Sequence, residues 1–273
     1  MFSRAAPCKG APWTVGAMAN VTFSGVPLSA VLEKLGVEPQ AAARFVAAEG
    51  RDLPSKPGEA DFEHSLPLAD VLERSILALK LNGEAIPAVH GGPVRLITPG
   101  YYGTMNVKWL SRLRFEDSES TNRHHRERYR TPLTPIEPGS EFSYNLDNSE
   151  ANWRMRIKSV IFAPLEGERL SAGRNEVRGV AFNDGAARIV AVEVSSDGGL
   201  TWRRAEIDRP ASPFAWHHWR IVLDLPRGAQ KIVARAVDAL GRTQPLDGAI
   251  HWNPAGYAWN GVHEVKVQVG GQS

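Results

Sequence analysis

The sequence predicts two domains of different class, an α+β domain over residues 1–138 followed by an all-β, immunoglobulin-like sandwich over residues 152–270. The first part mixes short helical patterns with strand-like runs, whereas the second alternates apolar and polar residues in about seven short runs separated by turn residues. Between them, residues 116–151 are polar and contain several prolines, which is typical of a crossing segment. A chain of 273 residues is long enough for two domains of ordinary size.

Two short helices are expected in the first domain. Residues 28–35 place leucine and valine at helical spacing, and Gly36 fits the C-terminal cap. Residues 68–72 repeat the same P-L-x-x-V-L-E pattern. We attribute this likeness to shared helix-start chemistry and not to an internal repeat.

The strands of the first domain are shorter and less regular. Residues 45–48 form an apolar run, and leucines alternate over residues 77–81. Asn82-Gly83 follows directly, and this dipeptide is a strong signal for a two-residue hairpin turn.

A dense basic segment at residues 122–130 lies within the crossing segment and lacks helical amphipathicity. We interpret it as a partly ordered connection that ends the first domain, with its charges in a solvated loop. The alternative is a cationic funnel that raises the local concentration of a small anion.

The second domain follows a period of two throughout. Turn signals at residues 183–185 and 197–199 separate its strands, and no cysteine pair is present, so its core depends on packing alone. The alternating runs lie at residues 153–157, 190–194, 219–225, 232–236 and 265–269.

Composition and motifs exclude several classes of function. The chain is 42% hydrophobic and 23% charged, and no run of about 18 apolar residues predicts a membrane span. The net charge of +2 is too small to argue for nucleic-acid binding. One cysteine, Cys8, excludes an internal disulfide and a cysteine-rich metal site. Walker, G-x-G-x-x-G and H-E-x-x-H motifs do not occur.

The most informative stretch runs from residue 90 to residue 110. His90, Arg95 and Lys108 lie there among apolar residues, glycines and prolines. A cation in such a segment is costly unless an anion pairs with it, and glycines let the backbone approach a bulky ligand. The pattern indicates a buried anionic group, for example a phosphate, held by these three side chains. A structural strand with an arginine–carboxylate pair is the open alternative.

The run PVRLITPGYYGTMNVKWL, residues 93–110, resembles the molybdenum-cofactor domain of the sulfite oxidase family. There, a His-x4-Arg pair and a lysine in a VKWL-like run hold the pyranopterin phosphate. The run SSDGGLTW, residues 195–202, resembles the dimerisation domain found in the same family. More weakly, the resemblance extends over nearly the whole chain. It implies a sulfite-oxidase-type molybdopterin domain, here truncated, followed by the sandwich, and it implies molybdopterin as the cofactor.

The resemblance also assigns roles. The residues that match cofactor contacts are Asp52, His90, Arg95 and Lys108. Those that match the substrate side are Trp13, as an aromatic wall, Tyr129, beside the metal, and His217, where the family has an arginine. A histidine is only partly charged near neutrality, so the affinity for an oxyanion would depend on pH. The plainer alternatives are a core indole for Trp13, a turn cap for Asp52 and a structural anchor for Tyr129.

One departure from the family pattern concerns the metal. The family attaches molybdenum through a cysteine that lies well before the tryptophan matched by Trp13, and counting back to it passes Met1. Cys8 does not match that position, so we assign no metal ligand. We therefore expect the chain to lack an N-terminal part, which leaves its status as an enzyme open. Any export signal would lie in that part, so the compartment stays undetermined.

The resulting prediction is a molybdenum-cofactor oxidoreductase that oxidises sulfite to sulfate by oxygen-atom transfer. No haem-binding C-x-x-C-H motif occurs, so the electrons pass to a separate, cytochrome-type acceptor. The resemblance further implies a homodimer. The alternatives are an inactive, truncated pterin-binding or dimerising paralogue, and a relative that acts on another sulfur or nitrogen oxyanion. A sugar- or protein-binding sandwich ranks lower, because it leaves the cations near residue 100 unexplained.

Overall fold

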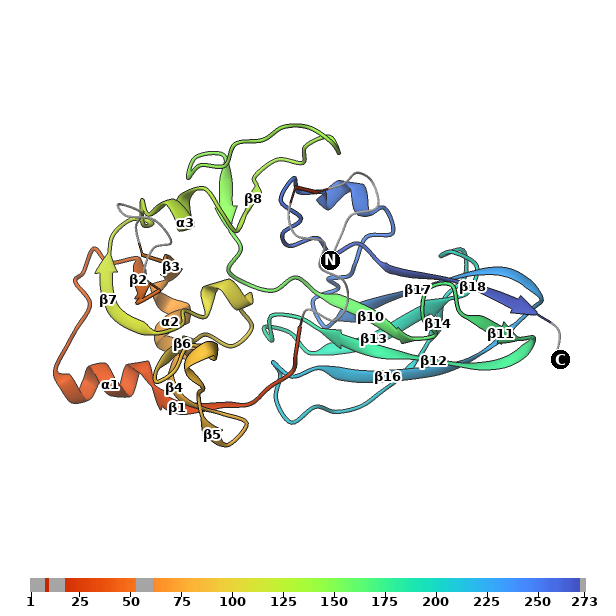
Figure 1. Ribbon diagram of the computed structural model, residues 1–273, viewed down its shortest axis with the longest axis horizontal. Coiled ribbons are helices and arrows are strands. Elements are labelled where there is room, and N and C mark those ends of the chain that lie inside the picture. Colours follow the sequence, from red (N-terminus) through yellow and green to blue (C-terminus); the bar gives the residue numbers. More distant parts are fainter. Residues whose placement is uncertain (1–7, 10–17, 53–60, 271–273) are drawn as a thin grey trace. The chain divides into compact units, whose positions relative to one another are not determined.

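The computed structural model describes residues 8–9, 18–52 and 61–270, and its elements are mostly strands with few helices (Figure 1). None of the helices within these described ranges has the length and apolar character needed to cross a membrane. The elements form two compact units, one built from residues 19–134 and 141–155 and the other centred on residues 156–270. Each unit is described by itself.

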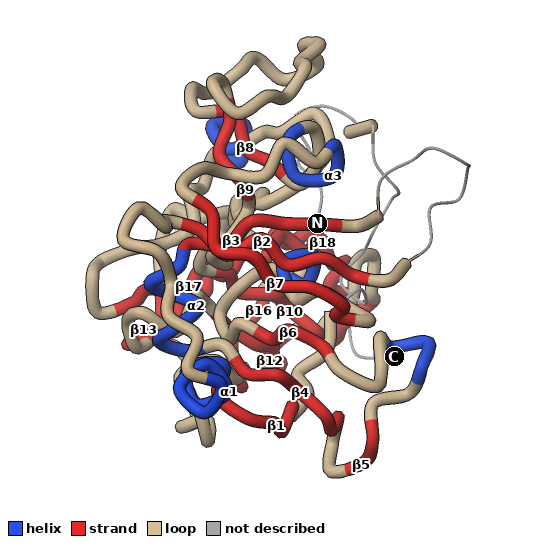
Figure 2. The backbone as a smooth tube through the Cα atoms, turned by 90° about the vertical axis from the view of Figure 1, so that its left-hand side faces the viewer, coloured by secondary structure: helices blue, strands red, loops and turns tan. Residues whose placement is uncertain are grey.

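The first unit contains a three-stranded antiparallel sheet in the order β3-β2-β7, whose strands adjoin one another in Figure 2. The strands are β2 (Phe45–Gly50), β3 (Glu63–Pro67) and β7 (Leu110–Glu116). Strand β2 is central, and its apolar run is fully buried between its neighbours. Strand β2 ends at Gly50, two residues before Asp52.

A second sheet of the first unit is organised around β4. Its strands are β1 (Phe23–Pro27), β4 (Ile76–Leu81), β5 (Glu84–Ala85) and β6 (Arg95–Ile97). The predicted hairpin between β4 and β5 is confirmed, since Asn82 and Gly83 both have positive φ angles, 51° and 88°, as a tight two-residue turn requires.

Both expected helices are present. Helix α1 (Leu28–Leu35) ends at Gly36 in the left-handed conformation, with φ 64°, as predicted for a glycine cap. Helix α2 (Leu68–Arg74) extends slightly further than the sequence pattern indicates. Only Leu28 of α1 is buried, so this helix lies on the surface of the unit. Short 3-10 turns, η2 (Ala88–His90) and η3 (Gly103–Met105), flank β6.

The segment after β7 is more ordered than the sequence suggests. It forms α3 (Arg123–Arg126) and β8 (Arg130–Pro132), and β8 pairs antiparallel with β9 (Ser149–Ala151). Residues 133–148 therefore form a loop whose two ends lie side by side, where β8 pairs with β9. His125 and Arg130 have no exposed surface, so the expectation of a solvated loop is wrong for both residues.

The second unit consists of two sheets packed around one core. One sheet has the order β10-β12-β16-β15 and the other β11-β18-β17-β13-β14 (Figure 1). Val177 and Trp219 from the first sheet share a buried cluster with Val192, Ile232 and Val265 from the second. Burial of each such side chain contributes about 1.5–3 kcal/mol, so packing alone can hold this unit together.

The strands of these two sheets confirm the alternating runs at residues 190–194, 219–225, 232–236 and 265–269, whereas residues 153–157 form no strand and the first strand of this unit begins at Lys158. Their bounds are β10 (Lys158–Ala163), β11 (Arg169–Ser171), β12 (Gly173–Phe182), β13 (Ile189–Ser195), β14 (Arg203–Arg204), β15 (Glu206–Ile207), β16 (His217–Leu225), β17 (Gly228–Asp238) and β18 (His263–Gly270), with a 3-10 turn, η4 (Gly248–His251). Asp197 stabilises the turn between β13 and β14, because its carboxylate accepts hydrogen bonds from the hydroxyls of Ser195 and Thr201, each at 2.6 Å. These bonds lower the pKa of Asp197.

Candidate functional site

Arg95 stands at the start of β6, where backbone oxygens hold its guanidinium. Nη1 donates to the carbonyl oxygen of His90 at 3.1 Å, and Nη2 donates to that of Asn106 at 2.8 Å. The guanidinium carbon lies 5.3 Å from the centre of the Phe23 ring. The Nε atom is buried and has no partner among the described residues. Arg95 is thus fixed in place while its buried Nε donor stays unused.

Lys108 lies against the same turn. Its side-chain stem packs on Gly91, where an added Cβ would come within 2.5 Å of the Cβ of Lys108. Gly91 also has a φ of 94°, so both the backbone and the close approach require glycine. The amino group is 3.5 Å from the carbonyl oxygen of Val89. The structure therefore brings Arg95 and Lys108 to the turn that contains His90.

The charges of this cluster are not neutralised by protein. No carboxylate among the described residues forms an ion pair with Arg95 or Lys108. The pKa of Arg95 is lowered because burial disfavours its charged form. The arginine–carboxylate alternative is therefore not what the structure shows, and the unbalanced positive charge favours an anionic ligand. His90 itself has an exposed side chain.

Asp52 joins the cluster at the end of β2. A Cβ added at Gly50 would lie 2.6 Å both from Oδ2 of Asp52 and from the carbonyl oxygen of Lys108, so the three residues are in close contact. Partial burial and the negative charge of Asp61 raise the pKa of Asp52 against the opposing effect of Lys108. All four residues expected at the cofactor thus lie in one region of the first unit.

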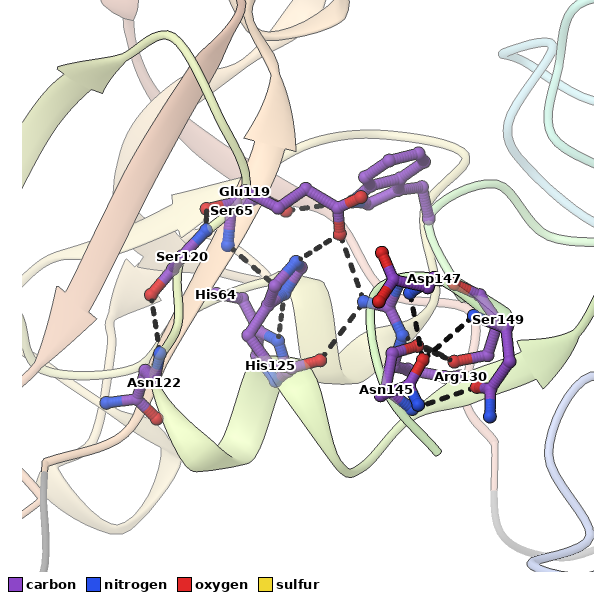
Figure 3. Close-up of polar contacts among 12 residues, drawn as sticks. His64, Ser65, Glu119, Ser120, Asn122, His125, Arg130, Asn145, Asp147 and Ser149 are labelled. Carbon is purple, nitrogen blue, oxygen red and sulfur yellow. Dashed lines mark hydrogen bonds and ion pairs between the residues drawn. The ribbon is translucent and has the colours of Figure 1, made fainter. Parts of the chain in front are cut away.

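A second group of polar side chains is buried beside α3 (Figure 3). Asn122 caps this helix by accepting the backbone N–H of His124 at 2.9 Å. Nδ1 of His125 lies 3.1 Å from Nδ1 of His64 and accepts the backbone N–H of Ser65 at 3.3 Å, while its Nε2 lies 2.7 Å from Glu119. Two distant parts of the chain, residues 64–65 and residues 119–125, therefore meet in one hydrogen-bonded chain.

Arg130 closes this chain at β8. Its guanidinium donates to Glu119 at 3.0 Å, to the hydroxyl of Ser149 at 2.9 Å and to two backbone oxygens (Figure 3). Burial by itself would raise the pKa of Glu119, but the hydrogen bonds from His125 and Arg130 outweigh it and lower the pKa. Glu119 is therefore an anion, which balances the one fully buried guanidinium that faces it.

Tyr129 is held in an unfavourable backbone conformation. Its φ is 55°, in the left-handed region that a bulky residue rarely adopts. Its carbonyl oxygen accepts the backbone N–H of Asn152 at 2.8 Å, and its ring centre lies 5.5 Å from that of His64 and 6.2 Å from that of Phe62. Such strain persists only where the surroundings fix it, and it is concentrated at functional sites.

The other expected residues are placed as follows. His217 is buried on β16 of the second unit, with Nδ1 3.2 Å from the carbonyl oxygen of Asp208. Cys8 lies near Gly256, where an added Cβ would be 3.6 Å from its sulfur. Trp13 lies outside the described residues.

Sequence reasoning missed His64, Glu119 and the burial of His125 and Arg130. A signal existed for His64, because His64 and Leu66 occupy alternate positions and so share one face of β3. A histidine on the inward face of a strand needs a polar partner, which residues 61 positions away provide here.

Residues 1–124 match the oxidoreductase molybdopterin binding domain, and residues 149–270 match the Mo-co oxidoreductase dimerisation domain. Mitochondrial sulfite oxidase of Homo sapiens is 32% identical over 272 residues, covering 96% of this chain and 49% of that protein. Nitrate reductase [NADH] of Solanum lycopersicum is 32% identical over 287 residues, covering 95% of this chain and 30% of that protein. The chain thus spans about half the length of the sulfite oxidases that it matches.

Among solved structures, the chain resembles the sulfane dehydrogenase SoxCD from Paracoccus pantotrophus. The TM-score is 0.77 at 32% identity, and the match covers 96% of this chain and 64% of that one.

Proposed function

The chain belongs to the sulfite oxidase family of molybdenum-cofactor oxidoreductases, and on that basis we propose that it oxidises sulfite to sulfate and passes the electrons to a cytochrome-type acceptor. The observation that supports this most directly is the guanidinium of Arg95, fixed by two carbonyl oxygens and left without a counter-charge among the described residues.

The residues of the first unit fit a pterin that carries a phosphate. Arg95 retains an unused buried Nε donor, and Lys108 supplies a second positive charge on the same turn. Both are suited to a phosphate, which accepts hydrogen bonds and carries negative charge. In this proposal His90 adds a donor at the exposed edge, and Asp52 accepts a hydrogen bond from an N–H of the pterin. When bound, the molybdenum cofactor supplies the oxygen-atom transfer and the two-electron chemistry.

The protein's own part is to bind and orient the small substrate. We assign Tyr129 the substrate side of the site, because its strained backbone is fixed on both sides by β8 and Asn152. Its hydroxyl can donate to an oxyanion or hold a water molecule. For Trp13 and His217, the substrate-side roles rest on the resemblance to the family alone. The carbonyl oxygen of Asp208 can only accept, so Nδ1 of His217 carries a proton.

The second unit is proposed to be an immunoglobulin-like sandwich through which two chains dimerise. Support comes from its two packed sheets and from the match of residues 149–270 to the dimerisation domain. Sedimentation of the purified protein tests this, with a dimer expected and a monomer at all concentrations contradicting it.

The decisive experiment combines metal analysis with turnover by this chain. Purified protein from a host that makes the molybdenum cofactor is expected to contain close to one molybdenum per chain. It is also expected to reduce cytochrome c or ferricyanide only when sulfite is added. Nitrate and methionine sulfoxide serve as competing substrates in the reductive direction.

Three results would change the assignment. Pterin without molybdenum and without turnover would favour the inactive, pterin-binding alternative. Turnover of nitrate or a sulfoxide without sulfite oxidation would move the chain to another substrate within the family. Absence of both pterin and metal would contradict the role assigned to Arg95 and Lys108.

A further inference from the structure

The imidazole of His64 offers a nitrogen that the proposed cofactor and substrate contacts do not use. The side chain has no exposed surface, and its Nε2 atom has no hydrogen-bond partner among the described residues. A buried polar atom without a partner costs about 1–3 kcal/mol, so a group of this kind calls for an explanation. Its position on β3 places it in ring contact with Phe62, at 4.7 Å, and with Tyr129, at 5.5 Å.

The hydrogen bonds around His64 determine which of its nitrogens carries the proton. The backbone N–H of Ser65 can only donate, so Nδ1 of His125 is an unprotonated acceptor. Nδ1 of His64, 3.1 Å away, must then carry the proton that joins the two rings. The remaining proton of His125 lies on Nε2, which donates to Glu119 at 2.7 Å. In a neutral His64, Nε2 is consequently a bare acceptor.

The surroundings keep His64 neutral. Burial is the largest cause that lowers its pKa well below the usual value, and the electrostatic effects of His125, His124 and Arg130 act in the same direction. The nearest groups on β3, α3 and β8 thus leave Nε2 with a lone pair that cannot be protonated easily, and Glu119 already balances the charge of Arg130. Such a lone pair suits a ligand that carries a hydrogen-bond donor.

We propose that His64 is a specificity-determining contact of the substrate site, whose Nε2 atom accepts a hydrogen bond from the hydroxyl of a singly protonated small oxyanion. This proposal rests on the proposed function, in which Tyr129 lines the substrate side. The ligand class is a hydrogen oxyanion, of the type X–OH with a net negative charge. Phe62 and Tyr129, both half-buried, are the rings beside which it would reach the imidazole.

The chemistry of the proposed reaction gives this contact a purpose. Hydrogen sulfite carries an O–H group that can donate to Nε2, whereas the product sulfate has no proton near neutral pH. A bare sulfate oxygen facing a bare nitrogen lone pair is repelled, because neither can donate. His64 would therefore bind the substrate more tightly than the product. With hydrogen sulfite bound, Nε2 accepts a hydrogen bond; with sulfate bound, Nε2 stays unpaired, which weakens binding of the product and favours its release.

Two inert anions test the contact without turnover. At about pH 8, inorganic phosphate is mostly HPO4 with two negative charges, and sulfate has the same charge, shape and similar size but no O–H. The protein is labelled with [15N]histidine, and correlations between ring protons and ring nitrogens report which nitrogen is protonated. The His64 signals are assigned by their loss in the His64→Gln variant.

Wild-type protein is expected to show a neutral His64 protonated on Nδ1. Addition of phosphate is expected to shift the Nε2 signal upfield, and addition of sulfate to leave it in place. His218, exposed on β16, is the internal control for unspecific salt effects. Phosphate held by Arg95 and Lys108 would not produce this difference, because both anions fit an arginine and a lysine.

The binding constants supply the second measurement. In the wild-type protein, phosphate should bind about tenfold more tightly than sulfate at the His64 signal. Titration calorimetry with both anions should show the same preference in the wild-type protein and its loss in His64→Leu. Equal shifts with both anions, no shift with either, or a proton on Nε2 would overturn the proposal. If His64→Gln does not fold, His64→Leu supplies the assignment, and the wild-type spectra then decide the outcome. Loss of sulfite turnover alone would count against the proposed function and not against this contact.

Discussion

Arg95 donates a 2.8 Å hydrogen bond from Nη2 to the carbonyl oxygen of Asn106, which fixes the guanidinium without neutralising its charge. A carbonyl oxygen removes one donor but leaves the positive charge available to a ligand. Arg95→Gln is therefore expected to reduce the pterin content of the purified protein by about tenfold or more, while thermal stability changes little. Pterin fluorescence after release measures the content.

Arg112→Gln is the matched control for this variant. Arg112 is 64% exposed and pairs with Glu49 at the surface, so its loss should leave the pterin content unchanged. Equal losses in both variants would show that arginine at position 95 acts through general stability and not through binding.

Tyr129→Phe removes the hydroxyl of this residue and keeps its ring and backbone position, so it tests the role of the hydroxyl alone. The ring contacts with His64 and Phe62 remain, so the melting temperature should stay close to that of the unchanged protein. We expect sulfite-dependent kcat/KM to fall about 10- to 100-fold if the hydroxyl orients the oxyanion. Steady-state kinetics at several sulfite concentrations measure this, and an unchanged kcat/KM would remove Tyr129 from the substrate side.

Arg130→Met is expected to destabilise the first unit by about 3–5 kcal/mol, because it removes a guanidinium with no exposed surface and leaves Glu119, only 19% exposed, beside His125 without its cation. Arg235→Met provides the comparison, since Arg235 pairs with Glu193 at 2.7 Å but is 30% exposed. Its loss should cost about 0–1 kcal/mol. Urea denaturation measures both, and similar costs would contradict the importance given to burial.

Lys158 predicts a pH dependence of stability in the second unit. Its amino group is buried, donates to the carbonyl oxygen of Gly261 at 2.8 Å and lies 4.0 Å from the centre of the Trp259 ring. Burial lowers its pKa to about 7, despite the contact with the aromatic ring. Between that value and the ordinary pKa of lysine, the unfolded chain binds one more proton than the folded chain, so this group makes stability rise with pH.

The Lys158→Met variant tests that linkage. The variant should be more stable than the unchanged protein at pH 6, and the difference should shrink as the pH approaches 10. Denaturation curves at several pH values measure it. A difference that is constant over this range would mean that the lysine stays charged in the folded protein.

The grouping of His90, Arg95 and Lys108 could be expected from the sequence, because these three residues are close neighbours along the chain. Arg95 and the backbone oxygen that it contacts in His90 are five residues apart, and one glycine turn connects them to Lys108. The hairpin at Asn82 and the glycine cap of α1 could be predicted for the same reason, since local backbone conformation decides both.

The hydrogen-bonded group beside α3 could not be predicted from local sequence. It consists of His64, His125, Glu119 and Arg130. Its members are joined across 61 residues by the pairing of β2 with β3 and by the docking of α3 on β3. In the sequence, a run such as residues 122–130 has the composition of a solvated loop. Only tertiary packing selects two of its residues for burial, because their charges meet partners that no local pattern reveals.

The pairing of β8 with β9 has a practical consequence for proteolysis. A protease cut anywhere between residues 133 and 148 leaves β8 in one fragment hydrogen-bonded to β9 in the other, at the base of the loop. The later fragment also keeps Arg154 bound to Asp70 through two contacts, at 2.9 and 2.5 Å. The nicked protein should therefore migrate as one particle in gel filtration and separate into two bands only after denaturation.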